Sequence, residues 1–328
     1  MKLIYNIKDR PKLGQNIVFA LQQIIAIMAA TLLVPILVSM AGLYCDPAAA
    51  LFGAGAGTIV YLLFTKFKSP VFLGSSFTFL GALQAVALQN FGYWGLIIGV
   101  GFAGLVYVII ALVIKFVGSG WIHKLLPNVI IGPILAIIGL SLASTATGWM
   151  SSNGIDGAYS LWYILCGLVT FVAIVLASVK GTKGMKLIPF IIGIGAGFVF
   201  ALILTGIGHL SDSSFFMNMR IVNFQPMIDC FGKISFESFL SVPDFTFMLA
   251  IKNKSTIDGT AIANLAVLFV PIAVVELAQH ISDHKNLGNI VGEDLLTDPG
   301  LHNTLLGDGV GSMVGAFFGG CANTTYGE

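Results

Sequence analysis

The chain has 328 residues and a formal net charge of +1, and its composition is 57% hydrophobic and only 9% charged. Soluble domains carry about 25% charged residues, so this composition excludes a soluble globular protein. The four cysteines are far apart and form no CxxC pair, so neither a zinc site nor a disulfide framework is indicated. We therefore expect a membrane protein.

A membrane-spanning helix needs roughly 20 apolar residues. The first apolar run is too long for a cleaved signal peptide and follows a polar N-terminus, so we expect it to be retained. Apolar stretches run over residues 13–43, 48–64, 94–114, 127–147, 162–179, 188–207, 259–279 and 303–319. Two further stretches, 71–88 and the run from residue 320, are interrupted by small polar residues. The sequence thus predicts ten membrane segments, of which the third and the tenth are broken.

Basic residues are distributed unevenly between the predicted loops. They occur before the first span and after the second, fourth and sixth, whereas the intervening loops contain Asp46 and Asp156 and no lysine or arginine. The positive-inside rule then places the N-terminus in the cytoplasm of a multi-pass protein of the cell membrane. On this orientation we expect an extracellular loop, rather than a lid, at 209–258, a cytoplasmic loop at 280–302 and an interfacial helix at 118–126.

Two parts of the chain resemble each other. LFGAGAGTIVYLLF (51–64) resembles LLGDGVGSMVGAFF (305–318), and the helices before them are also similar. Each copy is followed by a break, GSSFTF at 74–79 and NTTYGE at 323–328. An odd number of predicted spans separates the copies, so the second copy is inverted. Inverted repeats with broken segments are typical of secondary transporters, whose substrate binds between the breaks.

The second break places Glu328 at membrane depth. Backbone that is not helical survives there only inside protein or beside a polar cavity. An ionisable residue in such a position marks a candidate functional site.

The chain resembles the nucleobase–ascorbate transporter family (nucleobase:cation symporter 2), and most closely its bacterial uracil permease branch. The resemblance covers essentially the whole chain. It rests on LQQIIAIMAATLLVPIL (21–37), FLGSSFTFLGAL (72–83), AQHISDH (278–284), DLLTDPGLHNTLLGDG (294–309) and NTTYGE (323–328).

The resemblance implies an all-α polytopic membrane protein with an inverted-repeat (7+7) transporter fold. Two short antiparallel strands would lie in broken segments 3 and 10. Residues 1–117 would form the first part of a core domain with spans 1–4, and 118–208 the first part of a gate domain with spans 5–7. Residues 209–258 would form the extracellular loop, and 259–328 a second, truncated part of the core with spans 8–10. A homodimer through the gate domain is also implied.

By this resemblance, the protein is expected to import uracil in symport with protons by alternating access. Glu328, where the purine branch usually has glutamine, favours uracil, and a xanthine or purine permease is the alternative. The expected partners are uracil, protons and the lipid bilayer. We expect no cofactor, no metal, no nucleic acid and no enzymatic activity.

The family also implies which residues bind the substrate. The backbone N–H groups of Phe77 and Gly327 would donate to the ring carbonyls, and Glu328 would accept from a ring N–H. Tyr326 packs beside the site or has a structural role only. Gln23 and Ala30 of the first span are further candidates, although Gln23 is equally suited to an interhelical hydrogen bond.

The eighth span departs from the family pattern. Gln279 stands where the family has its substrate-binding glutamate, and Glu276 either substitutes for it or pairs with His280. Asp283 occupies a position that is usually His or Asp, and Asp308 has either a proton role or caps a helix break. The proton-coupling candidates are Glu328, Asp283, Glu276 and Asp308.

Other classes of function are weaker alternatives. His280, Asp283 and His284 have the i, i+4 histidine spacing of a zinc site, with His302 or Asp294 as a third ligand, and would indicate a membrane metallohydrolase. The position of this cluster at the end of the eighth span explains its polarity without a metal. A passive channel is distinguished from the transporter by its independence of a proton gradient.

Overall fold

The computed structural model describes residues 5, 7, 9–125, 128–152, 159–182, 185, 188–211, 213–232, 241–253 and 257–326. Within these ranges, seven helices are long and apolar enough to cross a membrane. They are α1 (Leu13–Met40), α2 (Pro47–Phe64), α4 (Gly92–Val117), α6 (Asn128–Ser151), α7 (Leu161–Lys180), α8 (Pro189–Gly208) and α12 (Gly259–Val291). The all-α polytopic class is therefore confirmed.

An eighth long helix, α13 (Leu301–Gly319), is less apolar and corresponds to the stretch expected at 303–319. The shorter elements are β1 (Leu73–Ser75), α3 (Leu80–Leu88), α5 (Gly120–Leu125), α9 (Ser214–Met217), α10 (Gln225–Phe231), α11 (Thr246–Lys252), the π-helical turn η3 (Leu296–Gly300) and β2 (Asn323–Thr325). The short helix expected at 118–126 is α5.

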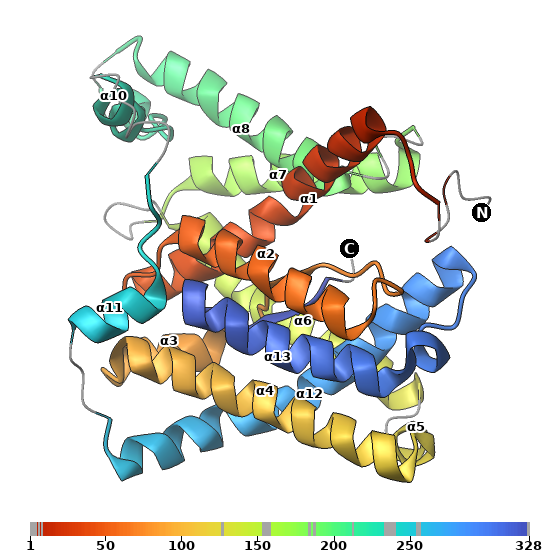
Figure 1. Ribbon diagram of the computed structural model, residues 1–328. Coiled ribbons are helices and arrows are strands. Elements are labelled where there is room, and N and C mark those ends of the chain that lie inside the picture. The colour runs from red at the N-terminus through yellow and green to blue at the C-terminus, as the bar shows by residue number, and fades with distance from the viewer. Residues whose placement is uncertain are drawn as a thin grey trace. The chain divides into compact units, whose positions relative to one another are not determined.

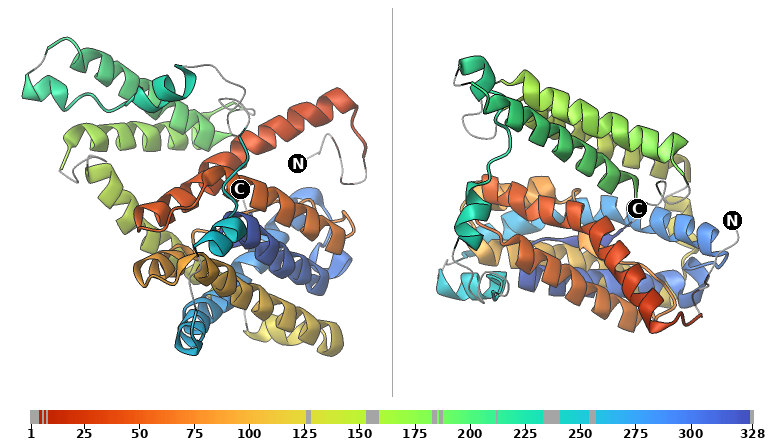
Figure 2. Two further views of the ribbon diagram at one scale, coloured as in Figure 1. Left: turned by 60° about the vertical axis from the view of Figure 1, so that its left-hand side comes forward. Right: turned by 90° about the horizontal axis from the view of Figure 1, so that it is seen from above.

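The chain forms two compact units, residues 1–138 with 243–328 and residues 139–242. In the second unit, α7 and α8 form a hairpin (Figure 2). The helices approach closely because Gly193 and Gly197 of α8 leave space for Ile174 and Thr170 of α7. After α8 the chain is anchored by Arg220, whose Nε donates to the Gly208 carbonyl at 2.9 Å.

In the first unit, α13 lies between α2 and α4 (Figure 1). Helices α2 and α13 are antiparallel, since Gly53 faces Gly315 while Gly57 faces Gly311. A Cβ atom on Gly57 would lie 2.5 Å from the Gly311 carbonyl oxygen, so the two backbones are in contact. Gly57 and Gly311 are also the matching last glycines of LFGAGAG and LLGDGVG. The two copies of the repeat therefore meet at equivalent residues and run in opposite directions, as an inverted repeat requires.

Strands β1 and β2 bring the two broken segments together. They pair antiparallel, with Leu73 opposite Thr325, which confirms the two short strands expected there. Thr58 of α2 accepts from the Leu73 N–H at 3.0 Å, and Ser312 of α13 accepts from the Asn323 N–H at 2.9 Å. These hydroxyls follow directly after the two matching glycines, so each copy holds its strand with an equivalent residue.

Helix α12 is longer than expected. It has 33 residues and ends at Gly292, which has a left-handed φ of +79°. The expectation of a cytoplasmic loop beginning at residue 280 was wrong, because His280 and His284 are both 0% exposed. Their ring nitrogens are hydrogen-bonded to groups of α2 and α13 and to the His280 carbonyl of α12 itself, so the helix continues through protein although its hydropathy falls.

The segment expected as a loop at 209–258 contains α9, α10 and α11 among its described residues. Part of it is held on the first unit. The Asp244 N–H donates to Asp46 Oδ2 at 2.8 Å, and the Phe247 ring stacks on Phe317 with centroids 4.6 Å apart. Burial of Thr246 and Ala250 fixes α11 on the neighbouring helices.

Candidate functional site

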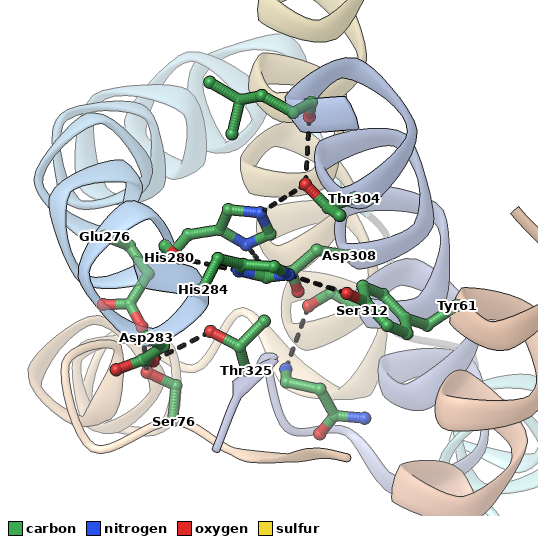
Figure 3. Close-up of polar contacts among 12 residues, drawn as sticks. Tyr61, Ser76, Glu276, His280, Asp283, His284, Thr304, Asp308, Ser312 and Thr325 are labelled. Atoms are coloured by element: carbon green, nitrogen blue, oxygen red, sulfur yellow. Dashed lines mark hydrogen bonds and ion pairs between the residues drawn. The ribbon is translucent and has the colours of Figure 1, made fainter. Parts of the chain in front are cut away.

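The two broken segments are both hydrogen-bonded to carboxylates of α12. Ser76, which follows β1, donates from Oγ to Glu276 Oε1 at 3.3 Å, and Thr325 of β2 donates from Oγ1 to Asp283 Oδ2 at 2.9 Å (Figure 3). Glu276 and Asp283 are seven residues apart, which places them on one face of the helix. Helix α12 therefore bridges the two copies of the repeat at the point where both stop being helical.

Glu276 has an open acceptor in a buried place. Its side chain is 1% exposed, and the hydroxyls of Thr78 and Thr324 lie beside the carboxylate. Among the described residues, however, no donor makes a hydrogen bond of good geometry to Oε2. Leaving a buried acceptor unsatisfied is costly, so Oε2 is suited to a donor supplied by a ligand.

Two further predicted site residues, Gln279 and Phe77, are both partly exposed. Gln279 is less than one turn from Glu276 on α12. Phe77 lies three residues before the start of α3 at Leu80, and its carbonyl accepts from the Leu80 N–H at 3.0 Å. The first N–H groups of a helix have no intrahelical partner, so those that follow Leu80 at the start of α3 can serve as donors.

Tyr326 directly follows β2 and extends the strand pair by one hydrogen bond. Its N–H donates to the Phe72 carbonyl at 3.0 Å, and its ring meets the Phe72 ring edge-on at a centroid distance of 6.4 Å. The tyrosine ring lies directly against Gly74, where no side chain would fit. A Cβ atom on Gly74 would also lie 3.1 Å from Oγ1 of the buried Thr31 of α1. Residues from α1, β1 and β2 thus meet at this aromatic ring.

A second polar cluster connects α12 with α13. His280 Nδ1 lies 2.7 Å from Asp308 Oδ2, and His280 Nε2 lies 3.1 Å from Thr304 Oγ1 (Figure 3). All three side chains are 0% exposed. The structure thus pairs His280 with Asp308 and not with Glu276. It also places Asp308 inside α13, so the cap at a helix break, which was one of the two expected roles, is wrong.

His284 extends this cluster toward α2. Its Nδ1 donates to the His280 carbonyl at 2.8 Å, and its Nε2 lies 2.7 Å from Tyr61 Oη, which is 2.8 Å from Ser69 Oγ. The rings of His280 and His284 are stacked with centroids 4.2 Å apart. Two positive charges at this separation repel by about 4 kcal/mol at an effective dielectric constant of about 20, so the pair does not carry both.

This geometry does not favour the zinc-site hypothesis. The ring nitrogens of His280 and His284 all lie within hydrogen-bonding distance of protein groups. Over the ranges that the structure describes, no three His, Cys, Asp or Glu side chains are grouped to hold a metal ion. Asp294 accepts from Leu296 and Thr297 of its own turn instead.

The other predicted residues are placed as follows. Gln23 is exposed on α1 and Ala30 is half-buried there. Gly327 and Glu328 lie outside the described residues. Sequence reasoning missed the hydroxyl partners of the carboxylates and histidines, although two of them, Ser76 and Thr325, lie in the runs of small polar residues that mark the two breaks. These partners are Ser76, Thr304 and Thr325, together with Tyr61.

Comparison of the sequence with known proteins identifies its family. A sequence profile described as "Permease family" matches residues 14–328. The chain is 38% identical over 327 residues to a uracil permease of Bacillus caldolyticus, covering 100% of this chain and 68% of that protein. It is 35% identical to a uracil permease of Bacillus subtilis (strain 168), covering 100% of this chain and 68% of that protein. It is also 31% identical to a uracil permease of Escherichia coli (strain K12), covering 98% of this chain and 66% of that protein.

Proposed function

Because the chain belongs to this permease family, we propose that it is a multi-pass membrane transporter that imports uracil in symport with protons. The observation that carries the substrate is the similarity to three proteins named uracil permease, which extends over 98–100% of this chain. The paired breaks beside a buried carboxylate support it, because they offer donors and acceptors within an apolar bundle.

Uracil is a flat ring with two N–H donors and two carbonyl acceptors, and each needs a partner in the site. The backbone N–H groups of Phe77 and Gly327 are the proposed donors to the carbonyls. Glu276 and Gln279, with Glu328, are the proposed acceptors. Tyr326 contacts the ring, and Gln23 and Ala30 border the site from α1.

Gln279 can accept a hydrogen bond but carries no charge, and hydrogen bonds to ionised groups are roughly twice as strong. Glu276, less than one turn away, has the open Oε2 described above. We therefore assign the charged acceptor to Glu276, as a substitute for the glutamate that Gln279 replaces.

Proton coupling needs an ionisable group whose state changes during transport. Glu276, Asp283, Asp308 and Glu328 are the candidates for that role. Transport then proceeds by alternating access, in which the core domain (1–117 with 259–328) moves against the gate domain (118–208). The N-terminus lies in the cytoplasm of a cell-membrane protein, and the gate domain forms a homodimer.

The test of this function is uptake of labelled uracil by cells that lack their own permease, with and without a protonophore. We expect saturable uptake that the protonophore suppresses and that xanthine does not compete. Competition by xanthine instead of uracil would support the purine alternative. Flux that neither saturates nor responds to the protonophore would contradict a symporter and indicate a channel.

Gln279→Glu is the most informative variant in the same assay. Because Glu276 already supplies the charged acceptor, we expect the KM for uracil to stay unchanged or to rise. A KM that falls by about 10-fold or more, as a new bond to a charged group of about 1.5–3 kcal/mol would give, would mean that Glu276 does not fill that position.

The packing of Tyr326 against Gly74 in the strand pair predicts the effect of a second substitution on uptake. Gly74→Ala places a methyl group against the Tyr326 ring, which must move. Overpacking costs about 1–3 kcal/mol, and the displaced ring lies at the proposed site, so we expect uptake to fall several-fold while the protein still reaches the membrane. Gly81→Ala is the matched control, because no atom lies within 4 Å of its added Cβ. Equal uptake by the two variants would contradict a role for Tyr326 in binding.

A further inference from the structure

The hydrogen bonds around Thr304 determine where the hydrogens of His280 lie. Thr304 Oγ1 is 3.0 Å from the Leu301 carbonyl oxygen, which can only accept. In one state of the cluster, the single hydroxyl hydrogen of Thr304 points to Leu301. In that state His280 Nε2, which is 3.1 Å from Thr304 Oγ1, carries a hydrogen and donates it.

With a hydrogen on Nε2, a second hydrogen lies on the Nδ1 side of the His280 ring. Nδ1 and Asp308 Oδ2 are 2.7 Å apart, a contact that requires a hydrogen between them. Either an imidazolium donates to a carboxylate, or a protonated carboxyl donates to a neutral imidazole. In both forms the pair is neutral overall, which suits two side chains that are 0% exposed.

Loss of that proton is accommodated by a single bond rotation. Nδ1 then keeps a hydrogen and donates to the Asp308 carboxylate, so Nε2 becomes an acceptor. The Thr304 hydroxyl turns from Leu301 to donate to Nε2, and only the Leu301 carbonyl loses a partner. The His280–Asp308 pair can therefore hold or release this proton while both nitrogens of the His280 ring stay hydrogen-bonded.

We propose that the His280–Asp308 pair is the site that takes up and releases the coupling proton, and that Thr304 is the positioning residue that accommodates both states. This inference rests on the proposed symport function and deepens it. On uptake, an O–H bond of a hydronium ion breaks and one N–H or O–H bond forms in the pair. On release, the same bond breaks and the proton returns to water.

Other titratable groups face the pair from α2, α4 and α12. Tyr107 of α4 meets the His280 ring edge-on at 6.0 Å, and Tyr61 of α2 faces Asp308, and a tyrosine is neutral near pH 7. His284 of α12 donates from Nδ1 to the His280 carbonyl, and its Nε2 lies 2.7 Å from Tyr61 Oη. The remaining neighbours are the carboxylates of α12, Glu276 and Asp283, which are bonded to the broken segments.

A cavity approaches this cluster from one side. A cavity of about 460 Å³ at the end of α12 is lined by His284, Lys285, Gly288, Asn289, Gly292, Glu293 and Asp294. Since the His284 ring stacks on His280, the cavity ends one aromatic ring away from the pair. The site that would bind uracil lies beside Glu276, one turn along α12 in the other direction. The pair is thus placed between the substrate and the solvent.

The experiment uses the full-length protein in proteoliposomes and compares two readouts. One is accumulation of labelled uracil driven by an imposed pH gradient, and the other is uracil exchange without a gradient, which needs binding but no net proton movement. Asp308→Asn should lose at least 90% of gradient-driven accumulation and keep exchange. Asp229→Asn, an exposed acid-to-amide change in the second unit, is the control and should keep both.

Thr304 provides an independent test that does not remove a charge. Thr304→Val removes the hydrogen-bond partner of His280 Nε2. The protonated ring loses more stabilisation than the neutral ring, because its hydrogen bond is charge-assisted. We expect the pH midpoint of uptake to move to lower pH, and Thr304→Ser to restore the original midpoint. A merely structural role would lower uptake at every pH without moving the midpoint.

The outcomes are distinct. Gradient-driven accumulation by Asp308→Asn, or an unmoved midpoint in Thr304→Val, would overturn this inference while uracil transport stands. If the unaltered protein exchanges uracil but ignores the gradient, proton coupling itself fails and this inference fails with it. If the unaltered protein does not exchange uracil, the proposed substrate is wrong.

Discussion

Gly57→Ala is expected to destabilise the protein by about 3 kcal/mol, at the upper end of the usual cost of overpacking. The added Cβ would lie 2.5 Å from the Gly311 carbonyl oxygen and 3.3 Å from Asn323 Nδ2. The first contact is with backbone, so it cannot be relieved by a change of rotamer. Helices α2 and α13 must separate instead, which also strains the strand pair that they hold through Thr58 and Ser312.

The measurement is the thermal unfolding midpoint of the detergent-solubilised protein, with the yield of monodisperse protein as a second readout. Gly55→Ala is a matched control on the same helix, because no atom lies within 4 Å of its added Cβ. That control should be neutral or should stabilise by up to about 1 kcal/mol, since alanine favours helix over glycine. If both variants unfold at the same temperature, the close contact at Gly57 does not determine stability.

Glu276→Gln is expected to weaken uracil binding by about 10- to 150-fold, which corresponds to about 1.5–3 kcal/mol for a hydrogen bond to a charged group. Glutamine has the same shape and can still accept from Ser76, so the contact between α12 and the first break should persist. Only the charged acceptor at Oε2 is lost.

Equilibrium binding of labelled uracil to the purified protein is the measurement, because it separates affinity from coupling. Glu293→Gln, just beyond the C-terminal end of α12, makes the same chemical change outside the proposed site and should bind as before. Asp308→Asn should also bind normally, since its proposed role is in the proton step. An unchanged affinity in Glu276→Gln would move the charged acceptor to another residue, and Asp283 would be the next to test.

Much of the fold could be predicted from the sequence. Hydropathy alone located the helices, because a spanning segment must be apolar over its full length. The breaks at Gly74 and Asn323 were visible as runs of small and hydroxyl residues, and the structure pairs them as β1 and β2. The repeat gave the antiparallel relation of α2 and α13, which is now seen in the contact of Gly57 with Gly311.

The end of α12 could not be predicted in this way. Hydropathy treats His280 and His284 as signs of a loop, since it measures transfer to lipid and takes no account of a partner in protein. The partners, Asp308 and Tyr61, lie on helices that are distant in sequence. Only the packing of α2, α12 and α13 shows that these polar groups satisfy one another.

The same reason limited the prediction of the site. The sequence singled out Glu276, Asp283 and Asp308 as ionisable groups in apolar surroundings. It did not divide them into two that hold the broken segments and one that is paired with a histidine. That division depends on which helix face each occupies and on what stands opposite, and a single sequence does not contain that information.

The meeting of Gly57 with Gly311 has a consequence for how such a protein can arise. A residue that touches its own counterpart lies on a twofold axis, and an interface built around a twofold axis is self-complementary. An unduplicated half carrying LFGAGAG or LLGDGVG would therefore present the same surface to a second copy of itself. Two such halves inserted in opposite orientations could associate through this glycine contact, so gene fusion would only have to join an interface that already existed.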